Sequence, residues 1–493
     1  EVFVIVSLTL FLPICLEQFA RDNGYLLPDK TTPCTAVPAP PSIPGDSEEA
    51  GRCVVKLGWM WVDSASFSLY VNSISVALQA LTVISMGNIA DHPPHRKRLL
   101  LAFAFFGSLA ATLFLLLPSS SPIWPASALL GICANVGFGA SVVAMNAYLP
   151  TLARASEEVV SRRAELHATV SSTRHPREQT AVEARNGDES DFQNEPLLAD
   201  EGGHVDEEEV ENLRKEYNTA LSRATSRISS QGIAFGYAAG ILMLFVALVP
   251  VTLLHGTTFS LRLAIGLSGI WWALFSLPAA AWLPSSSLAS KIDSENDAEA
   301  AWVEEEEEND GKREWSTRRE IIGAWKRLGG MLHWREIKRL RYTFQYLAAW
   351  FLLSDGFTTI TSTAILFGKT TLHMPPSSLI LIGIISPCAG IVGSLLWPKL
   401  QRRFVWSNLT VIVVLVCLAS LLPVYGCLGF LTFFKNGSVK FGGLTTPGEM
   451  YGLAVYFGTV YGAFQGYARA FYSELIPTGE EARWYALFSI TDK

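Results

Sequence analysis

An aspartate lies inside one of the long apolar stretches of this sequence. Asp355 belongs to LLSDGFTTITST (352–363), where Thr358 and neighbouring hydroxyl side chains could line a wet cavity. An ionised group at the centre of a membrane helix costs about 2.5–3.5 kcal/mol, so such residues usually have a function. A carboxylate here would bind an ammonium group or carry a proton. The alternative is a structural acid capped by a neighbouring donor.

A second apolar stretch carries an arginine and a glutamate. FQGYARAFYSEL (464–475) contains Arg469, with Gln465 one helical turn before it and Glu474 five residues after it. A guanidinium group is planar and permanently charged, so Arg469 would bind a carboxylate through two parallel hydrogen bonds, in bidentate geometry. A second interpretation pairs Arg469 with Glu474 as part of a gate. Both interpretations remain open at this point.

Neutral polar side chains also occur in the apolar stretches. Tyr70, Asn72 and Asn146 are candidates for hydrogen bonds to a ligand, as is Asn135. Helix–helix hydrogen bonds inside a membrane bundle are the more ordinary role of such residues.

The elements that would position these groups are membrane helices. The chain has 493 residues, of which 49% are hydrophobic and 17% charged, against about 25% charged in soluble domains. Ten apolar runs are long enough to cross a bilayer as helices, which needs roughly 17–25 residues, and almost none alternates like a barrel strand. We therefore predict an all-α polytopic membrane protein. The spans are 2–19, 64–90, 99–117, 125–148, 231–253, 262–283, 343–366, 377–397, 407–427 and 449–470.

Two features of the chain ends lead us to expect further helical sequence. The first span begins at once with Val2, and an eleventh apolar run starts near Trp484 and stops at Lys493. The expected bundle is therefore truncated at both ends.

The distribution of cations assigns the loops to the two sides of the membrane. Arginine and lysine concentrate in loops that follow even-numbered spans, including 91–98, 284–342 and 398–406, so these loops are predicted to be cytosolic. The opposite side holds the sequon at Asn436 and the loop containing Cys34 and Cys53. Glycosylation of Asn436 is expected there. Cys34 and Cys53 either pair, as oxidising conditions would allow, or remain two free thiols.

The loops divide the chain into three regions. Residues 1–283 form an N-terminal transmembrane bundle whose cytosolic insert, at about 149–230, is predicted to be mostly disordered because it is polar and poor in aromatic residues. Its NEPLL segment (194–198) is a candidate signal for sorting machinery. Residues 284–342 form a cytosolic linker with an acidic run and an amphipathic helix, which lies either on the membrane surface or on the cytosolic ends of the spans. Residues 343–493 form the C-terminal bundle.

A short basic hinge connects the second and third spans. Its sequence, GNIADHPPHRKR (87–98), places Gly87 four residues before Asp91 and follows with Arg96, Lys97 and Arg98. This pattern resembles the signature of major facilitator superfamily transporters, although HPPH replaces the compact segment usual in that family. The resemblance implies two pseudo-symmetric six-helix halves, and GSLLWPKLQRRF (393–404) repeats the plan with Trp397 in place of the acid. A further pair of matching segments, at 139–150 and 466–477, supports an internal duplication.

Several longer stretches are similar to the fungal autophagy-related vacuolar amino-acid effluxers. They include WVDSASFSLYVNSISVALQAL (61–81), NVGFGASVVAMNAYLPTLAR (135–154) and ARAFYSELIPTGEEARWYALFSITDK (468–493). The resemblance implies a multi-pass vacuolar membrane protein that exports leucine and other neutral amino acids to the cytosol after autophagic degradation, by alternating access. The alternative is a non-transporting scaffold or a membrane-bound factor in autophagic-body breakdown. The sequence lacks hydrolase and metalloprotease motifs, so no enzyme activity, metal or cofactor is predicted, and nothing indicates nucleic-acid binding.

Overall fold

The structure is a computed structural model of the chain. It describes residues 11–27, 30–36, 52–119, 121–170, 201–254, 257–283, 317–372, 374, 376–429, 442–477 and 479–491. The start of the first predicted span, Asn436, the NEPLL segment and the acidic run lie outside these ranges.

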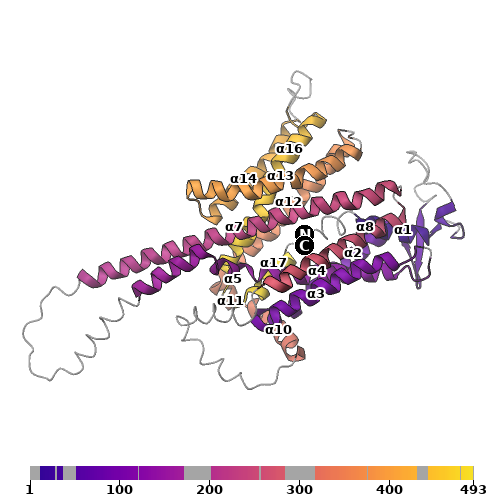
Figure 1. The fold of residues 1–493 in the computed structure, drawn as a ribbon. Helices are drawn as coiled ribbons and strands as arrows, with labels where there is room; N and C mark the ends of the chain where they lie inside the picture. The colour runs from indigo at the N-terminus through magenta and orange to yellow at the C-terminus, as the bar shows by residue number, and fades with distance from the viewer. Residues whose placement is uncertain are drawn as a thin grey trace, which may run out of the picture.

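Long helices make up most of the described chain (Figure 1). The N-terminal half contains α1 (Leu12–Asp22), α2 (Ser64–Asp91), α3 (Pro93–Leu113), η3 (Phe114–Leu116), α4 (Ala126–Asn146), α5 (Leu149–Arg154), α7 (Glu201–Leu253) and α8 (Thr258–Trp282). The linker forms α10 (Thr317–Met331) and α11 (Trp334–Arg339). The C-terminal half contains α12 (Arg341–Thr370), α13 (Pro376–Phe404), α14 (Asn408–Leu428), α16 (Pro447–Leu475) and α17 (Glu481–Thr491).

Eight of the described helices are long and apolar enough to cross a membrane. They are the membrane portions of α2, α3, α4, α7, α8, α12, α13 and α14, and each coincides with a span predicted from the sequence. Helix α16 has the required length, with 29 residues, but does not reach the same hydropathy. Most of its glycines and several of its polar residues are buried against other helices instead of facing lipid.

The break between α2 and α3 follows from local sequence. His92 has an extended backbone (φ −72°, ψ 117°), and Pro93 and Pro94 begin α3. Proline disfavours a helical conformation in the residue before it, yet fits the first turn of a helix where its missing N–H is not needed. The chain therefore reverses within a few residues and places the basic cluster at the start of α3.

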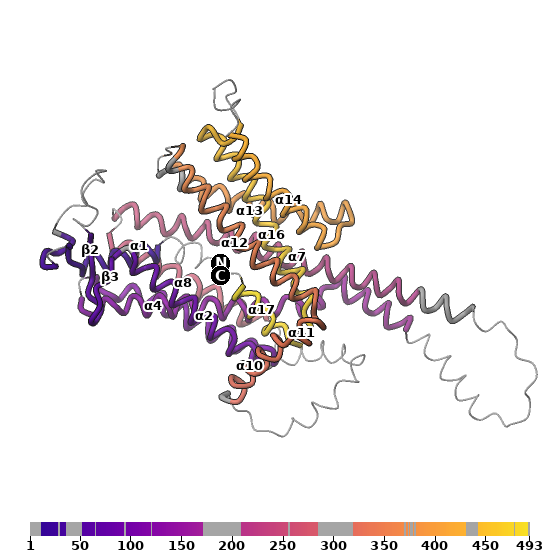
Figure 2. Tube along the Cα trace, turned by 180° about the vertical axis from the view of Figure 1, so that it is seen from behind, coloured from indigo at the N-terminus to yellow at the C-terminus, as the bar shows by residue number. Residues whose placement is uncertain are grey.

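Two large hydrophobic cores hold the bundle together. One belongs to the N-terminal half alone and contains buried residues of α1, α2, α3, η3, α4, α7 and α8, such as Phe19, Phe114 and Ile265. The other joins the two halves and combines residues of α2, α3 and α4 with residues of α12, α14, α16 and α17, such as Tyr467 and Trp484. The two groups of helices lie together at the end that contains α5, α11 and α17 and diverge toward the other end (Figures 1 and 2).

The loops predicted to be cytosolic meet at one end of the bundle. Lys97 donates to the Leu283 carbonyl (2.9 Å), and Thr343 donates to the Leu475 carbonyl (2.7 Å). The end of α1 and the loop before α4 meet at the opposite end, where the Asn23 amide donates to the Ser119 carbonyl (2.7 Å). Following the prediction from the cation distribution, we refer to the first of these ends as cytosolic and to the opposite end as luminal.

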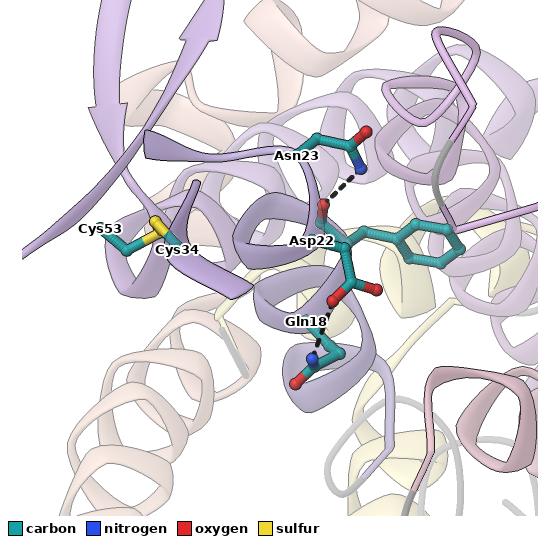
Figure 3. Close-up of a disulfide and its surroundings, with 6 residues drawn as sticks. Gln18, Asp22, Asn23, Cys34 and Cys53 are labelled. Carbon is teal, nitrogen blue, oxygen red and sulfur yellow. Dashed lines mark hydrogen bonds between the residues drawn. A yellow bond between two sulfur atoms is a disulfide. The ribbon is translucent and has the colours of Figure 1, made fainter. Parts of the chain in front are cut away.

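A small sheet caps the luminal end and was not predicted. Strands β1 (Tyr25–Leu26), β2 (Cys53–Leu57) and β3 (Met60–Asp63) pair antiparallel in this order. Cys34, in a 3-10 turn (Cys34–Ala36), forms a disulfide with Cys53 at the start of β2, beside the end of α1 where Asp22 accepts from Gln18 (Figure 3). The disulfide ties the loop between α1 and α2 to the sheet.

The prediction of disorder over 149–230 was wrong for the residues that the structure describes there. Residues 157–170 form a helix that runs antiparallel to the first part of α7, and this hairpin projects from the cytosolic end (Figure 2). Val159 packs against Ala220 and Ala224 in a buried seam, and Arg162 pairs with Glu216 (3.1 Å). The seam consists of small side chains spaced one helical turn apart, so overall composition does not reveal it.

The predicted amphipathic helix packs on the cytosolic end of a span. The Glu320 carboxylate accepts from the Asn88 amide (2.5 Å), and the Trp325 indole donates to the Ser85 hydroxyl (3.1 Å), which fixes α10 against α2. The linker therefore contacts the N-terminal half directly.

Candidate functional site

The acid of the basic hinge joins the two halves of the molecule. One oxygen of Asp91, at the end of α2, accepts from the backbone N–H of Ala482 (2.6 Å), and the other accepts from Arg483 (2.7 Å). Both partners lie in the first turn of α17, where unpaired backbone N–H groups and the helix dipole favour a negative charge. Asp91 is 8% exposed, so water screens the pair weakly. This contact joins α2 to α17 at the cytosolic end of the bundle.

The hinge arginine makes a second connection between the halves. Arg96 is buried and donates to the carbonyls of Ala90 (3.0 Å) and Ala147 (3.2 Å), and it forms an ion pair with Glu481 (3.3 Å). Arg154 at the end of α5 lies 3.9 Å from the same carboxylate. The acid of each half therefore binds cations of the other half.

The remaining hinge residues have distinct roles. A Cβ at Gly87 would lie 3.3 Å from the Cα of Arg483, so glycine lets α2 and α17 approach closely. Lys97 binds the end of α8 through the Leu283 carbonyl, whereas Arg98 is exposed at the surface. We call Asp91, Arg96, Arg154, Glu481 and Arg483 the charged lock.

The second copy of the hinge forms a neutral counterpart of this lock. Gln401 occupies the position in the second hinge that His95 occupies in the first, because each lies eight residues after the hinge glycine. Gln401 is buried, with 2% of its surface exposed. Its carbonyl accepts from Tyr467 of α16 (2.9 Å) and Ser226 of α7 (3.2 Å), and its amide donates to Asn408 of α14 (2.7 Å). Gln401 thus links α7 of the N-terminal half to three helices of the C-terminal half. The second hinge has Trp397 where the first has the acid Asp91. Hydrogen bonds of Gln401 connect the helices at this junction without that acid.

Close helix contact positions α16 beside this junction. A Cβ at Gly458 would lie 2.1 Å from the Ser386 carbonyl oxygen, and one at Gly393 would lie 2.0 Å from that of Thr459. Only glycine permits such an approach of α13 and α16. The Ser229 hydroxyl of α7 donates to the Gly466 carbonyl (2.8 Å), which fixes α16 against the N-terminal half as well.

A small cavity lies beside Arg469 within the C-terminal half. Its volume is about 70 Å³, and Arg469 and Gln465 line it together with Ser354 and Trp350. The Gln465 carbonyl accepts from Tyr237 of α7 (3.1 Å), so the cavity wall is connected to the other half. Aromatic side chains complete the lining: Phe357, Tyr461, Phe464 and Phe488.

The cavity contains a buried donor with no partner among the described residues. Trp350 is 5% exposed, and its indole N–H has no hydrogen-bond acceptor there. Its ring stacks on Phe488 with centroids 4.5 Å apart, which fixes the position of the indole. A buried N–H without an acceptor costs about 1–3 kcal/mol, which an anionic or carbonyl oxygen in the cavity would recover. The space accommodates a carboxylate group or a few water molecules rather than a whole leucine.

Glu474 and Arg469 each contribute to a distinct feature of the structure. The Glu474 carboxylate accepts from Asn408 (2.5 Å), at the neutral junction, while Arg469 faces the cavity. The pairing of Arg469 with Glu474 as part of a gate stays a prediction, and Asn408 is a hydrogen-bond partner of Glu474 in the structure.

Asp355 and Thr358 lie outside the cavity. Both are exposed on α12, and no described residue forms a hydrogen bond or ion pair with the Asp355 carboxylate. The capping donor suggested for a structural acid is therefore absent from the described part of the chain. Thr358 donates to the Ser354 carbonyl (2.9 Å) within its own helix.

The neutral candidates divide into two groups. Asn135 of α4 donates to Ser75 of α2 (2.5 Å), as expected for helix–helix contact. Tyr70 is exposed on α2, and Asn146 is half-buried at the end of α4. Asn72 lines a cavity of about 20 Å³ between α1, α2 and α4. None of the three lies beside Arg469.

Sequence reasoning missed four residues of the site. Trp350 and Gln401 have no charge, and Glu481 and Arg483 lie in a segment that we took only as a cytosolic connection before a further span. The register of the internal repeat would have indicated Gln401, and the acids at the start of α17 would have indicated a helix N-terminus. Within the described ranges, no group of three His, Cys, Asp or Glu residues could hold a metal ion.

Comparison with known proteins identifies the family. The family described as "Vacuole effluxer Atg22 like" matches residues 1–493. Autophagy-related protein 22 of Cryptococcus neoformans is 37% identical over 522 residues, covering 100% of this chain and 85% of the relative. Autophagy-related protein 22-1 of Aspergillus fumigatus is 38% identical over 518 residues, covering 100% of this chain and 80% of the relative.

Solved structures show more distant similarity. A bacterial homologue of the iron transporter ferroportin, in an outward-facing state, is 14% identical with a TM-score of 0.47, covering 100% of this chain and 89% of that chain. A proton:xylose symporter of the major facilitator superfamily is 11% identical with a TM-score of 0.48, covering 99% and 86%. The sequence relatives confirm the family resemblance: the chain belongs to the Atg22-like vacuole effluxers, and it is a multi-pass transporter of the vacuolar membrane and not an enzyme.

Proposed function

We propose that this transporter moves leucine and other neutral amino acids from the vacuole lumen to the cytosol by alternating access. The observation that carries the proposal is the cavity where Arg469 and the unpartnered Trp350 N–H lie together among aromatic rings. A guanidinium group and an N–H donor suit the carboxylate that all amino acids share. Apolar rings suit an uncharged side chain, which would pack there once the cavity widens.

The charged lock supports the alternating-access part of the proposal. It closes the cytosolic end through contacts between α2 and α17, and the luminal core contains no described residue of the C-terminal half. Rocking the halves apart at the cytosolic end would break the lock and open a path from the cavity to the cytosol.

Leucine uptake into proteoliposomes tests the role of Arg469. Arg469→Gln removes a charge that would make two charge-assisted hydrogen bonds, each worth about 1.5–3 kcal/mol, so we expect the half-saturating leucine concentration to rise at least about tenfold. Arg98→Gln, which removes an exposed cytosolic arginine, is the matched control and should transport normally. Equal kinetics in both variants would contradict the assignment of Arg469.

Asp355 is proposed to face the transport pathway, where its carboxylate either binds the substrate ammonium or carries a proton. Two modes of the same assay distinguish these roles for Asp355→Asn. Loss of uptake driven by a pH gradient with normal leucine exchange indicates a proton carrier, while loss of both indicates substrate binding. Normal activity in both modes would remove Asp355 from the pathway.

The same experiment addresses the alternative function. A protein that serves as a scaffold, or as a factor in autophagic-body breakdown, would show no flux of any amino acid in either mode. The cavity chemistry favours transport, because a scaffold has no need for an arginine and a buried indole N–H without an acceptor beside one cavity.

A further inference from the structure

The linker helices present a strongly basic surface at the cytosolic end. Residues 317–341 contain eight Lys and Arg residues and two Glu residues, so the segment carries a net charge of +6, whereas the whole chain carries −7. Among the cations, Lys326 of α10 and Lys338 and Arg339 of α11 are exposed. Of the two acids, Glu320 accepts from the Asn88 amide and Glu336 lies 3.7 Å from Arg339. The two acids therefore offset only a small part of the positive charge.

Large apolar side chains accompany these cations. Ile322 and Trp325 of α10 are 60% and 40% exposed, and Leu332 and Trp334 in and before α11 are 52% and 66% exposed. The Lys338 ammonium lies 5.6 Å from the centre of the Trp334 ring. Exposed aromatic residues next to lysine and arginine are typical of the boundary between lipid tails and headgroups.

The position of Trp325 continues the lipid-facing side of α2. Leu78 and Leu81 are exposed on one face of α2, and Ser85 follows one turn later on the same face. The Trp325 indole donates to the Ser85 hydroxyl, so the middle of α10 contacts α2 where this apolar stripe ends. Because α2 crosses the membrane, a helix fixed at this point lies at the level of the cytosolic headgroups.

We propose that α10 and α11 form a binding surface for anionic phospholipid headgroups of the cytosolic leaflet. The cations would contact phosphate and carboxylate groups, while Ile322, Trp325, Leu332 and Trp334 insert among the first carbons of the lipid tails. Charge complementarity and continuity with α2 favour lipid as the occupant of this surface. The proposal concerns binding and does not depend on which solute the protein transports.

Titration of the purified full-length protein in neutral detergent tests the proposal. Short-chain phosphatidylserine is added, bound lipid is counted by native mass spectrometry, and short-chain phosphatidylcholine serves as the uncharged reference. We expect the wild-type protein to bind phosphatidylserine preferentially, and Lys338→Gln/Arg339→Gln to bind it about 30-fold more weakly, because each cation near an anionic surface contributes about fivefold.

A matched pair of cations exists on the cytosolic hairpin. Arg214 and Lys215 are adjacent and exposed, and Lys215 pairs with Glu211 much as Arg339 pairs with Glu336. Arg214→Gln/Lys215→Gln should therefore bind phosphatidylserine like the wild type. If both double variants lose the same affinity, or neither loses any, the proposed surface is wrong.

Two further comparisons separate lipid from other occupants. Trp334→Ser should weaken binding, whereas Trp59→Ser, which changes a tryptophan that is 88% exposed on the luminal sheet, should not. Equal competition by glycerophosphoserine, the headgroup without tails, would indicate a site for soluble anions and overturn the proposal. A third outcome is that phosphatidylserine binds only after Glu304–Glu308 are changed to Gln. This result would mean that the acidic run of the same chain occupies the basic surface in the wild-type protein, and it would also overturn the proposal.

Discussion

The charged lock makes a quantitative prediction for Asp91. Asp91→Asn keeps the shape of the side chain but removes the charge that binds Arg483 and the N–H of Ala482. Removing one partner of a buried ion pair costs about 3–5 kcal/mol. Arg483 is 17% exposed at its side chain and has Glu480 as a second partner at 3.3 Å, so we expect a loss at or below the lower limit of this range, about 2–3 kcal/mol. That energy shifts the ratio of cytosol-open to cytosol-closed molecules by roughly 30- to 140-fold.

Thiol labelling measures this shift. Ala486 of α17 is 3% exposed and would lie 3.7 Å from a Cβ at Gly87, so Ala486→Cys places a thiol beneath the closed lock. In a background without the five unpaired cysteines, an impermeant maleimide added to the cytosolic side of intact vacuoles should label this introduced thiol much faster when Asp91→Asn is present.

The luminal end supplies the control. The Asp22 carboxylate accepts from Gln18 (3.0 Å) and Thr258 (2.9 Å) and plays no part in the lock, so Asp22→Asn should leave the labelling rate unchanged. An unchanged rate in Asp91→Asn would refute the claim that this acid closes the cytosolic end. Adding Arg483→Gln to Asp91→Asn should increase the rate little further, because both changes remove the same contact.

Three other changes have defined outcomes. Gln401→Leu leaves the hydroxyl of Tyr467 and the polar groups of Ser226 and Asn408 without their partner, so the thermal midpoint in detergent should fall by an amount equivalent to about 2–4 kcal/mol, whereas Asn72→Ala at an exposed position should change it little. Cys53→Ser opens a disulfide that joins residues 19 positions apart, which we expect to cost about 3 kcal/mol and to make the luminal sheet sensitive to protease in sealed vesicles of inverted orientation; resistance equal to wild type would contradict this. Ala224→Glu places a charge in the buried seam beside Val159, so residues 157–170 should become accessible to protease while transport persists, and an intact hairpin would show that the seam does not hold it.

The sequence anticipated the membrane helices because these depend on local hydropathy. The same reasoning located the hinge, since Gly87, Asp91 and Arg96 lie within one short segment. It did not identify what the hinge binds. Asp91 and Ala482 are 391 positions apart in the chain, and no local pattern records a contact of that range.

The error about the hairpin and the open choice for Arg469 have equally specific causes. The hairpin at 157–170 and α7 was predicted to be disordered because composition averages over the seam formed by Val159 and Ala224. For Arg469 and Glu474 the sequence left two interpretations open, because a separation of five residues places them on different sides of a helix with 3.6 residues per turn. Glu474 therefore reaches Asn408, and Arg469 reaches the cavity.

Taken alone, the sequence determined that the chain is a helical membrane protein with a doubled plan, because apolar length, basic loops and internal repeats are local properties of the chain. Only the tertiary structure decided which groups act together. Three features arise where distant segments of the chain pack together: the charged lock, the Gln401 junction and the cavity of Arg469 and Trp350. This packing depends on glycine contacts and side-chain shapes between helices that are far apart in the sequence, so no local sequence pattern reveals it.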